Sequence, residues 1–158
     1  KGSLFSIELP LVARPLRQEL PLPSGVVQRP VFGLSVVCVD DDAANLSALS
    51  VLLQQWQIDD VTCFYDEESL LEYAANHSAP DALLIDYQLG QHLNGLQLYE
   101  KIKLKWGSVN GILVSASPEA GLAMKAKQYG LMFLAKPIKP AALRASLNHL
   151  KMLKRSAG

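Results

Sequence analysis

Short, almost wholly apolar stretches alternate along the chain with longer stretches in which apolar residues recur at helical spacing. Continuous apolar segments of this length are typical of strands in a parallel sheet that is covered on both faces. The predicted strands are Ser35–Val39, Val61–Tyr65, Ala82–Ile85, Gly111–Val114 and Leu131–Ala135.

The stretches between these strands predict amphipathic helices. Leu46, Leu49 and Leu53 fall on one face of the first helix, and Asp42 precedes it as a capping residue. The other four helices are predicted to follow Asp66-Glu67-Glu68, to run from Gly95 to Trp106, to begin at Ser117-Pro118-Glu119, and to run from Pro140 to Lys154. Five strand–helix units predict an α/β fold: a doubly wound, five-stranded parallel sheet with five helices, a flavodoxin-like three-layer sandwich with strand order 2-1-3-4-5.

The chain before residue 34 has a different pattern. Residues 1–12 alternate polar and apolar side chains, which predicts one further strand. Residues 13–33 are rich in proline and poor in large core residues, so they predict an extended linker. The α/β domain is therefore predicted at residues 34–154, with a tail at 155–158.

The composition is that of a folded domain and limits the classes of molecule that it is expected to bind. The chain of 158 residues is 49% hydrophobic and 19% charged, and it has 15 basic and 15 acidic residues, so binding to nucleic acid through bulk charge is not expected. No apolar run approaches the roughly 18 residues of a membrane span, and no signal peptide opens the chain, so we expect a cytoplasmic domain without membrane contact. Cys38 and Cys63 lie in apolar runs without metal-ligand or disulfide-scaffold spacing, which predicts buried, reduced thiols. The first residue is not Met, so we expect a fragment of a longer protein.

Polar residues stand at the carboxyl ends of the predicted strands. Asp40 and Asp41 follow the first strand, Asp86 the third, Ser115 the fourth, and Lys136 ends the fifth. In the order 2-1-3-4-5 the first and third strands are neighbours, so the three acids converge, and Ser115 and Lys136 lie beside them. Clustered carboxylates repel one another, and a hard cation such as Mg²⁺ or Mn²⁺ relieves that repulsion. With a lysine and a hydroxyl nearby, the set suits phosphoryl transfer to an aspartate, which would form an acyl phosphate.

The segments around these residues resemble the receiver domain of two-component response regulators. The matching motifs are Val37–Asp42, Leu83–Leu89, Ile112–Ala116 and Phe133–Pro137, in the family's order and each at the end of a strand. The similarity extends over about three quarters of the chain, and it implies that Asp86 accepts a phosphoryl group from phosphohistidine. It also implies that Asp41 binds the metal directly, that Asp40 acts through water, and that the backbone carbonyl of Gln88 completes the site.

The resemblance implies further roles near the acceptor. Ser115 would be the switch hydroxyl, Phe133 the switching aromatic residue, and Lys136 the phosphate-binding lysine, with a cis bond to Pro137. The chain departs from the family pattern after the acceptor, where the usual proline is absent and residues 90–95 predict a slightly longer loop.

The first ten residues, Lys1 to Pro10, resemble the last strand of a histidine-kinase ATP-binding domain. Together with the linker and the receiver pattern, this implies the C-terminal receiver of a hybrid sensor histidine kinase whose whole chain is anchored in a membrane. The implied partners are the kinase's dimerisation and phosphohistidine domain or a histidine phosphotransfer protein. The fragment lacks the ATP site, so we expect phospho-acceptance and autodephosphorylation but no kinase activity. The alternative for this segment is an unrelated N-terminal strand.

Two other functions are compatible with parts of the pattern. A haloacid-dehalogenase-type phosphatase would use the acids after the first strand, but Ala44 stands where that family has Thr or Val, and Asp86 would have no role. A receiver-fold interaction module that is not phosphorylated would not need the full set of acids, hydroxyl and lysine. A nucleotide-binding role is disfavoured because no glycine-rich loop follows the first strand.

Overall fold

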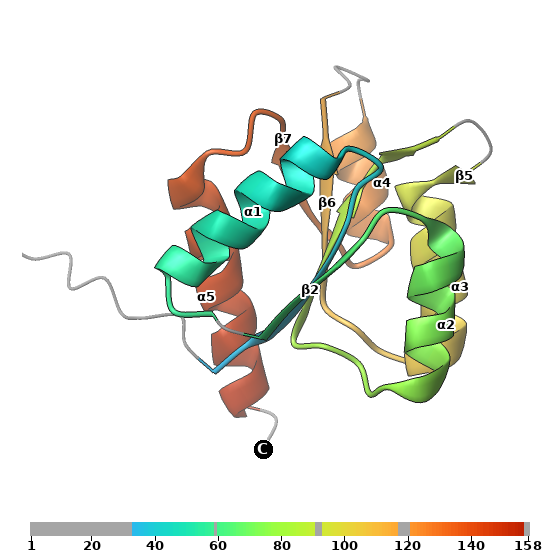
Figure 1. Ribbon diagram of the computed structural model, residues 1–158, viewed down its shortest axis with the longest axis horizontal. Helices are drawn as coiled ribbons and strands as arrows, with labels where there is room; N and C mark the ends of the chain where they lie inside the picture. The colour runs from blue at the N-terminus through green and yellow to red at the C-terminus, as the bar shows by residue number, and fades with distance from the viewer. Residues whose placement is uncertain (1–32, 59, 91–92, 117–120, 157–158) are drawn as a thin grey trace, which may run out of the picture.

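The computed structural model describes residues 33–58, 60–90, 93–116 and 121–156 (Figure 1). The strand predicted for residues 1–12 lies outside the described residues, and so does nearly all of the predicted linker. Within the described parts, none of the helices is both long and apolar enough to cross a membrane.

Five parallel strands form one sheet, and their order confirms the predicted doubly wound topology. The strands are β1 (Ser35–Val39), β2 (Asp60–Phe64), β3 (Ala82–Asp86), β6 (Gly111–Ser115) and β7 (Met132–Ala135). They lie in the order β2-β1-β3-β6-β7. When the five parallel strands alone are numbered along the chain, this is the predicted order 2-1-3-4-5. The observed bounds differ from the predicted ones by a residue at some strand ends, and β3 and β6 extend through Asp86 and Ser115.

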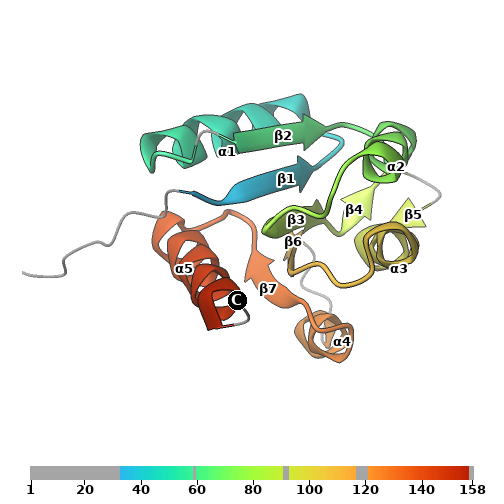
Figure 2. The same ribbon diagram turned by 90° about the horizontal axis from the view of Figure 1, so that it is seen from below.

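The helices cover both faces of the sheet and confirm the three-layer sandwich. They are α1 (Ala43–Gln55), α2 (Glu67–Asn76), α3 (Gly95–Trp106), α4 (Leu122–Gln128) and α5 (Pro140–Ser156). Helices α1 and α5 lie on one face, and α2, α3 and α4 lie on the other (Figure 2). Each face has its own core of buried apolar side chains, because the inner strands are apolar at successive positions and so present apolar residues to both layers.

Polar caps fix where the helices begin. The side chain of Asp42 accepts a hydrogen bond from the amide of Ala44 (2.8 Å) at the start of α1, as predicted. The buried residues of that helix are the three predicted leucines. At the start of α3, Asn94 and Gln97 form a reciprocal capping box.

Two local predictions need comment. Helix α4 is described from Leu122, after the N-cap Gly121, whereas the start predicted at Ser117–Glu119 lies outside the described residues. The stretch after β3 is not a simple loop but contains a short antiparallel hairpin of β4 (Gln88–Leu89) and β5 (Leu93–Asn94). Gly90 follows β4 directly, and its backbone φ of 69° is a conformation that glycine adopts much more readily than other residues.

Candidate functional site

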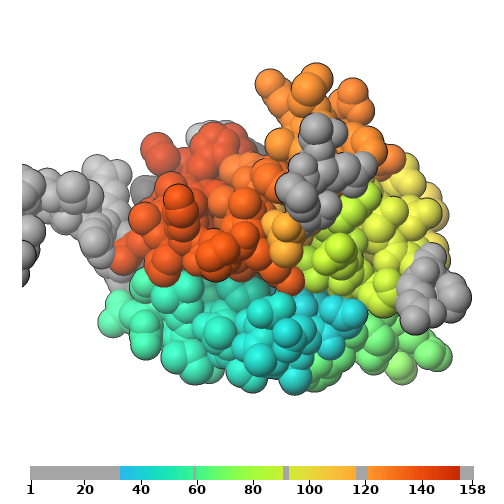
Figure 3. All heavy atoms as spheres, turned by 90° about the horizontal axis from the view of Figure 1, so that it is seen from above, coloured from blue at the N-terminus to red at the C-terminus, as the bar shows by residue number. Residues whose placement is uncertain are grey.

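The predicted site residues gather at the carboxyl edge of the sheet. Val39 of β1 pairs with Ile85 of β3, so Asp40 and Asp86, the next residues along, are neighbours across the two strands. In Figure 3, the segments that follow β1 (blue-cyan), β3 (yellow-green) and β7 (orange) meet on one face of the molecule. The strand order therefore brings together acids that are far apart in the sequence.

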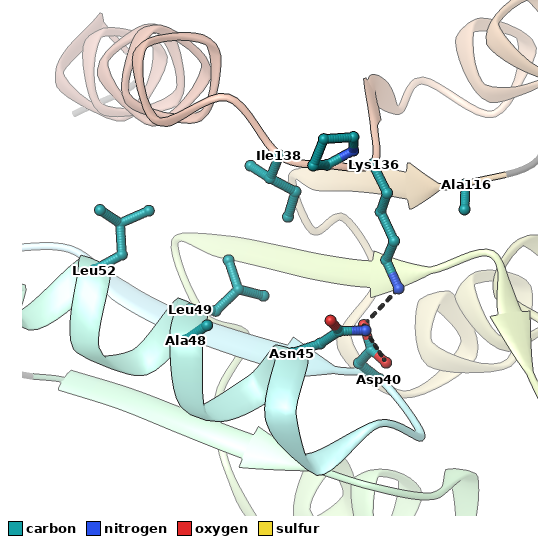
Figure 4. Close-up of a pocket in the computed structure, with 9 residues that line it drawn as sticks. Asp40, Asn45, Ala48, Leu49, Leu52, Ala116, Lys136 and Ile138 are labelled. Atoms are coloured by element: carbon teal, nitrogen blue, oxygen red, sulfur yellow. Dashed lines mark hydrogen bonds and ion pairs between the residues drawn. The ribbon is translucent and has the colours of Figure 1, made fainter. Parts of the chain in front are cut away.

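Lys136 joins the two buried carboxylates. Its Nζ atom lies 2.8 Å from Oδ2 of Asp40 and 3.0 Å from Oδ2 of Asp86. Figure 4 shows the lysine side chain reaching from the segment after β7 toward Asp40. Partial burial lowers the pKa of Lys136, but the hydrogen bonds to Asp40 and Asp86 offset that effect, so its pKa is raised and the ammonium stays charged.

The Asp40 carboxylate is held on several sides. Its Oδ1 atom accepts a hydrogen bond from the backbone amide of Asp42 (2.9 Å). The side-chain amide of Asn45 lies 3.2 Å from each carboxylate oxygen, and Figure 4 shows it pointing from α1 toward Asp40. With Lys136 on Oδ2, these donors fix the orientation of a carboxylate that is only 3% exposed.

Asp86 is also buried, but its carboxylate accepts fewer hydrogen bonds than that of Asp40. One of its oxygens, Oδ2, pairs with Lys136, whereas the buried Oδ1 accepts no hydrogen bond from the part of the chain that the structure describes. Burial raises the pKa of Asp86, and the hydrogen bond from Lys136 counteracts part of that effect. A buried carboxylate oxygen without a donor is costly, so this atom is well suited to meet a ligand.

Asp41 completes a group of three acids. Its side chain is exposed, and its Oδ2 atom accepts a hydrogen bond from the amide of Gly90 (3.1 Å) in the turn after β4. One oxygen from each of Asp40, Asp41 and Asp86 lies within 4.8 Å of the others. This all-oxygen set, together with the unbonded oxygen of Asp86, fits a hard divalent cation such as Mg²⁺ or Mn²⁺ and does not fit Zn²⁺. Gln88 lies in β4, two residues beyond Asp86.

Ser115 and Phe133 lie on the other side of Asp86. Ser115 ends β6, is 1% exposed, and accepts a hydrogen bond through its backbone carbonyl from the amide of Lys136 (2.8 Å). Phe133 pairs in register with Leu113, is half-buried, and packs on the core beneath α3 and α4. The bond between Lys136 and Pro137 is cis, as predicted.

Comparison with known families decides the class of this domain. Residues 36–148, which make up most of the chain, match the family described as the response regulator receiver domain. The chain belongs to the receiver domain family. Receiver domains act in two-component signal transduction, bind Mg²⁺ at an acidic site, and interact with histidine kinases or phosphotransfer proteins in general.

Solved structures agree with this assignment. The receiver domain of the sensor histidine kinase PA1611 from Pseudomonas aeruginosa, which has a magnesium ion coordinated in its active-site cleft, is 26% identical (TM-score 0.64; 75% of this chain and 97% of that chain covered). The N-terminal domain of an uncharacterised protein from Wolinella succinogenes is 28% identical (TM-score 0.69; 79% and 99% covered). The receiver domain of the Francisella response regulator 1452 has the same fold at 20% identity (TM-score 0.68; 77% and 98% covered). No curated protein matches the sequence.

Sequence reasoning missed three residues that shape the acidic site of this receiver. Asn45 and Gly90 donate hydrogen bonds to Asp40 and Asp41, and Gly95 packs against the backbone of Asp86. Asn45 stands five residues after Asp40, in the first turn of α1, and this position was the only indication of its role in the sequence. The contact of Gly90 depends on the hairpin, which the pattern did not predict.

A pocket of about 470 Å³ opens beside the acids of the receiver. Asp40, Asn45 and Lys136 line its polar end. Its apolar wall combines α1 with the segment after β7, and the residues there are Ala48, Leu49, Leu52, Pro137 and Ile138 (Figure 4). The candidate site is thus open toward a surface on which another molecule can lie.

Proposed function

We propose that this receiver domain accepts a phosphoryl group from a phosphohistidine onto Asp86, in a reaction that depends on Mg²⁺. The observation that carries the proposal is the state of the Asp86 carboxylate. One oxygen is paired with Lys136, and the other is buried without a hydrogen-bond donor among the described residues, next to two further acids. A carboxylate in this setting is oriented and only partly neutralised, as a nucleophile for phosphorus must be.

The chain's own residues account for the transfer. An oxygen of Asp86 attacks the phosphorus atom, the new O–P bond forms, and the N–P bond of the phosphohistidine breaks. The histidine ring takes the electron pair of that bond and, protonated on its other nitrogen, leaves as neutral imidazole. Lys136 stabilises negative charge on the transferring oxygens, because its ammonium already lies 3.0 Å from Asp86.

The acids beside Asp86 would hold the metal. The carboxylates of Asp40, Asp41 and Asp86 and the backbone carbonyl of Gln88 are the proposed ligands, with Asp40 acting through water. When bound, Mg²⁺ supplies positive charge that offsets the repulsion between the carboxylates and the incoming phosphoryl group. Asn45 and Gly90 keep Asp40 and Asp41 in place by hydrogen bonds.

We propose that Ser115 and Phe133 carry the response to phosphorylation. Ser115 ends β6, one residue after Val114, which is the parallel partner of Asp86. Phe133 lies on β7, which pairs with the strand of Ser115 and contacts α4. Movement of the Ser115 hydroxyl toward a phosphoryl group on Asp86 would therefore change the position of β7 and α4 and the surface that they form.

The proposed donor belongs to a hybrid sensor histidine kinase or to a histidine phosphotransfer protein. The likeness to the receiver of the sensor kinase PA1611, and the kinase-like pattern of residues 1–12 before a linker, support this context. The donor histidine has to reach Asp86 from the open side of the site. The pocket beside Lys136 offers an apolar wall there, on which a helix that carries the histidine can pack.

Intact mass after incubation with acetyl phosphate tests the proposal. We expect one phosphoryl adduct on the wild-type chain in the presence of Mg²⁺ and none after chelation. Asp86→Asn should abolish the adduct, whereas Asp42→Asn, which changes the neighbouring exposed acid to another good capping residue, should retain it. A folded protein that takes up no phosphoryl group would favour the unphosphorylated interaction module, and an adduct that persists in Asp86→Asn would mean that another residue is the acceptor.

A further inference from the structure

We propose that Cys38 and Cys63 form a redox modification site, in which a peroxide converts the two thiols into an intramolecular disulfide. This site is separate from the acceptor chemistry and does not depend on it. It rests on the pairing of two strands that bring together cysteines 25 positions apart in the sequence.

Strand register places the two cysteines side by side. Cys38 of β1 is the parallel partner of Cys63 of β2. Neighbouring strands lie about 4.8 Å apart, which falls within the Cα–Cα range of about 4.4–6.8 Å that disulfides span. Both side chains belong to the apolar core beneath α1 and α5, so they point to the same face of the sheet.

The two thiols interact directly but are unequally accessible. A hydrogen bond from the Cys38 thiol lowers the pKa of Cys63 to about 7, while partial burial acts in the opposite direction. Cys38 is fully buried, whereas Cys63 is half-buried and lies on β2, one of the two edge strands of the sheet. Cys63 is therefore the thiol that a small oxidant reaches first, and Cys38 is placed to react with the product.

The chemistry balances with a peroxide as the oxidant. The sulfur of Cys63 attacks one oxygen of hydrogen peroxide, the O–O bond breaks, and a sulfenic acid and one water form. The sulfur of Cys38 then attacks the Cys63 sulfur, the S–O bond breaks, and the thiol proton leaves with the hydroxyl as a second water. The two thiols lose two electrons in total, and the peroxide gains them.

The bridge would act on the strand pair that carries Asp40. The amide of Asp40 donates a hydrogen bond to the carbonyl of Phe64 (3.2 Å), the residue after Cys63. A covalent link between Cys38 and Cys63 would thus lie next to this bond on the same two strands.

The test uses the folded wild-type chain. The protein is treated with hydrogen peroxide, the peroxide is removed with catalase, and the remaining thiols are alkylated with N-ethylmaleimide in denaturant. We expect intact mass to show the loss of two hydrogens and no maleimide adduct, and peptide mapping to show a peptide pair linked through Cys38 and Cys63. Dithiothreitol should then restore both alkylatable thiols.

Single variants separate the two roles. In Cys38→Ala, oxidation should stop at a sulfenic acid on Cys63, which dimedone traps. In Cys63→Ala, peroxide should leave Cys38 unmodified. The proposal is overturned if the folded wild-type chain keeps two alkylatable thiols, forms only intermolecular disulfides, or carries a dimedone-trapped Cys63 as often as Cys38→Ala does. The first two of these outcomes are measured on the wild-type chain alone, so a variant that fails to fold does not leave the question open.

Discussion

Gly95 lies against the backbone carbonyl of Asp86 so closely that a Cβ atom at Gly95 would stand 2.3 Å from the carbonyl oxygen. The same Cβ would come within 2.9 Å of the side chain of Ile85. The amide of Gly95 also donates a hydrogen bond to the carbonyl of Tyr87 (2.8 Å). The first turn of α3 is therefore packed directly on the strand end that carries the acceptor, and only a glycine leaves room for this contact.

Gly95→Ala should destabilise the domain and disturb the site. The backbone oxygen cannot yield as a flexible side chain would, so α3 or the end of β3 must shift to admit the methyl group. We expect a loss of about 1–3 kcal/mol in the free energy of unfolding, together with weaker Mg²⁺ binding. Urea unfolding and titration with Mg²⁺ measure the two effects.

Glu100→Ala is the matched control for this variant, because it introduces alanine at an exposed position of the same helix. It should change the free energy of unfolding by less than about 0.5 kcal/mol. Wild-type stability and Mg²⁺ affinity in Gly95→Ala would show that the contact with Asp86 has no consequence.

Lys136→Gln should make the stability of the domain more dependent on Mg²⁺. In the metal-free domain the ammonium offsets the repulsion between Asp40 and Asp86, and its removal leaves two buried carboxylates without their counter-charge. Without a divalent cation, we expect the free energy of unfolding of Lys136→Gln to be lower than that of the wild-type chain by about 1–3 kcal/mol. Saturating Mg²⁺ should restore part of this loss, since it supplies positive charge to the same acids.

Thermal unfolding with and without Mg²⁺ measures this coupling. The increase in Tm on addition of Mg²⁺ should be larger for Lys136→Gln than for the wild-type chain. Lys139→Gln, at an exposed position three residues further on, should behave like the wild-type chain. Equal increases in all three proteins would contradict the role of Lys136 as a counter-charge for the acids.

The sheet and the position of the acids followed from the sequence because both depend on strong, simple patterns. Buried parallel strands must be apolar at consecutive positions, and crossover connections are right-handed, so few strand orders are possible. Once β1 and β3 are neighbours, Asp40 and Asp86 must meet at their carboxyl ends, as the register of Val39 with Ile85 shows.

The remaining features depend on contacts that no local pattern encodes. The hairpin has strands of two residues, too short for any alternation to be recognised, and the bond from Gly90 to Asp41 depends on it. The register that places Cys38 beside Cys63 is a property of the assembled sheet. Gly121, the N-cap of the described helix α4, has no side chain that could indicate a cap in the sequence.

Asn45→Ala should weaken Mg²⁺ binding while leaving the fold intact. The amide of Asn45 contacts both oxygens of Asp40 and so restrains the carboxylate that is expected to reach the metal through water. Loss of such an orienting partner lowers metal affinity by about 10-fold or more. Calorimetric titration with Mg²⁺ measures the change. Ser47→Ala, at an exposed position of the same helix, is the control and should bind as the wild-type chain does. Unchanged affinity in Asn45→Ala would mean that its contact with Asp40 does not position the carboxylate.

Asp66 couples the stability of α2 to pH. It is the N-cap of that helix, and its carboxylate accepts hydrogen bonds from the amide (2.8 Å) and the hydroxyl (3.0 Å) of Ser69. These bonds hold the pKa of Asp66 below its ordinary value. A group whose pKa is lower in the folded state stabilises the protein above its unfolded pKa, about 3.9 for Asp, and this stabilisation is lost as pH falls through the folded pKa.

Asp66→Asn should therefore flatten the loss of stability in acid. Asparagine is an equally good cap but does not titrate, so stability near pH 7 should change by only a few tenths of a kcal/mol, whereas the variant should lose less than the wild-type chain below about pH 4. Asp66→Ala removes the cap and should cost about 1 kcal/mol near neutral pH. Urea unfolding midpoints across this pH range measure both effects, with Glu72→Gln on the exposed side of α2 as the carboxylate control. If Asp66→Asn and the wild-type chain lose stability in parallel as pH falls, the hydrogen bonds from Ser69 do not favour the charged form of Asp66.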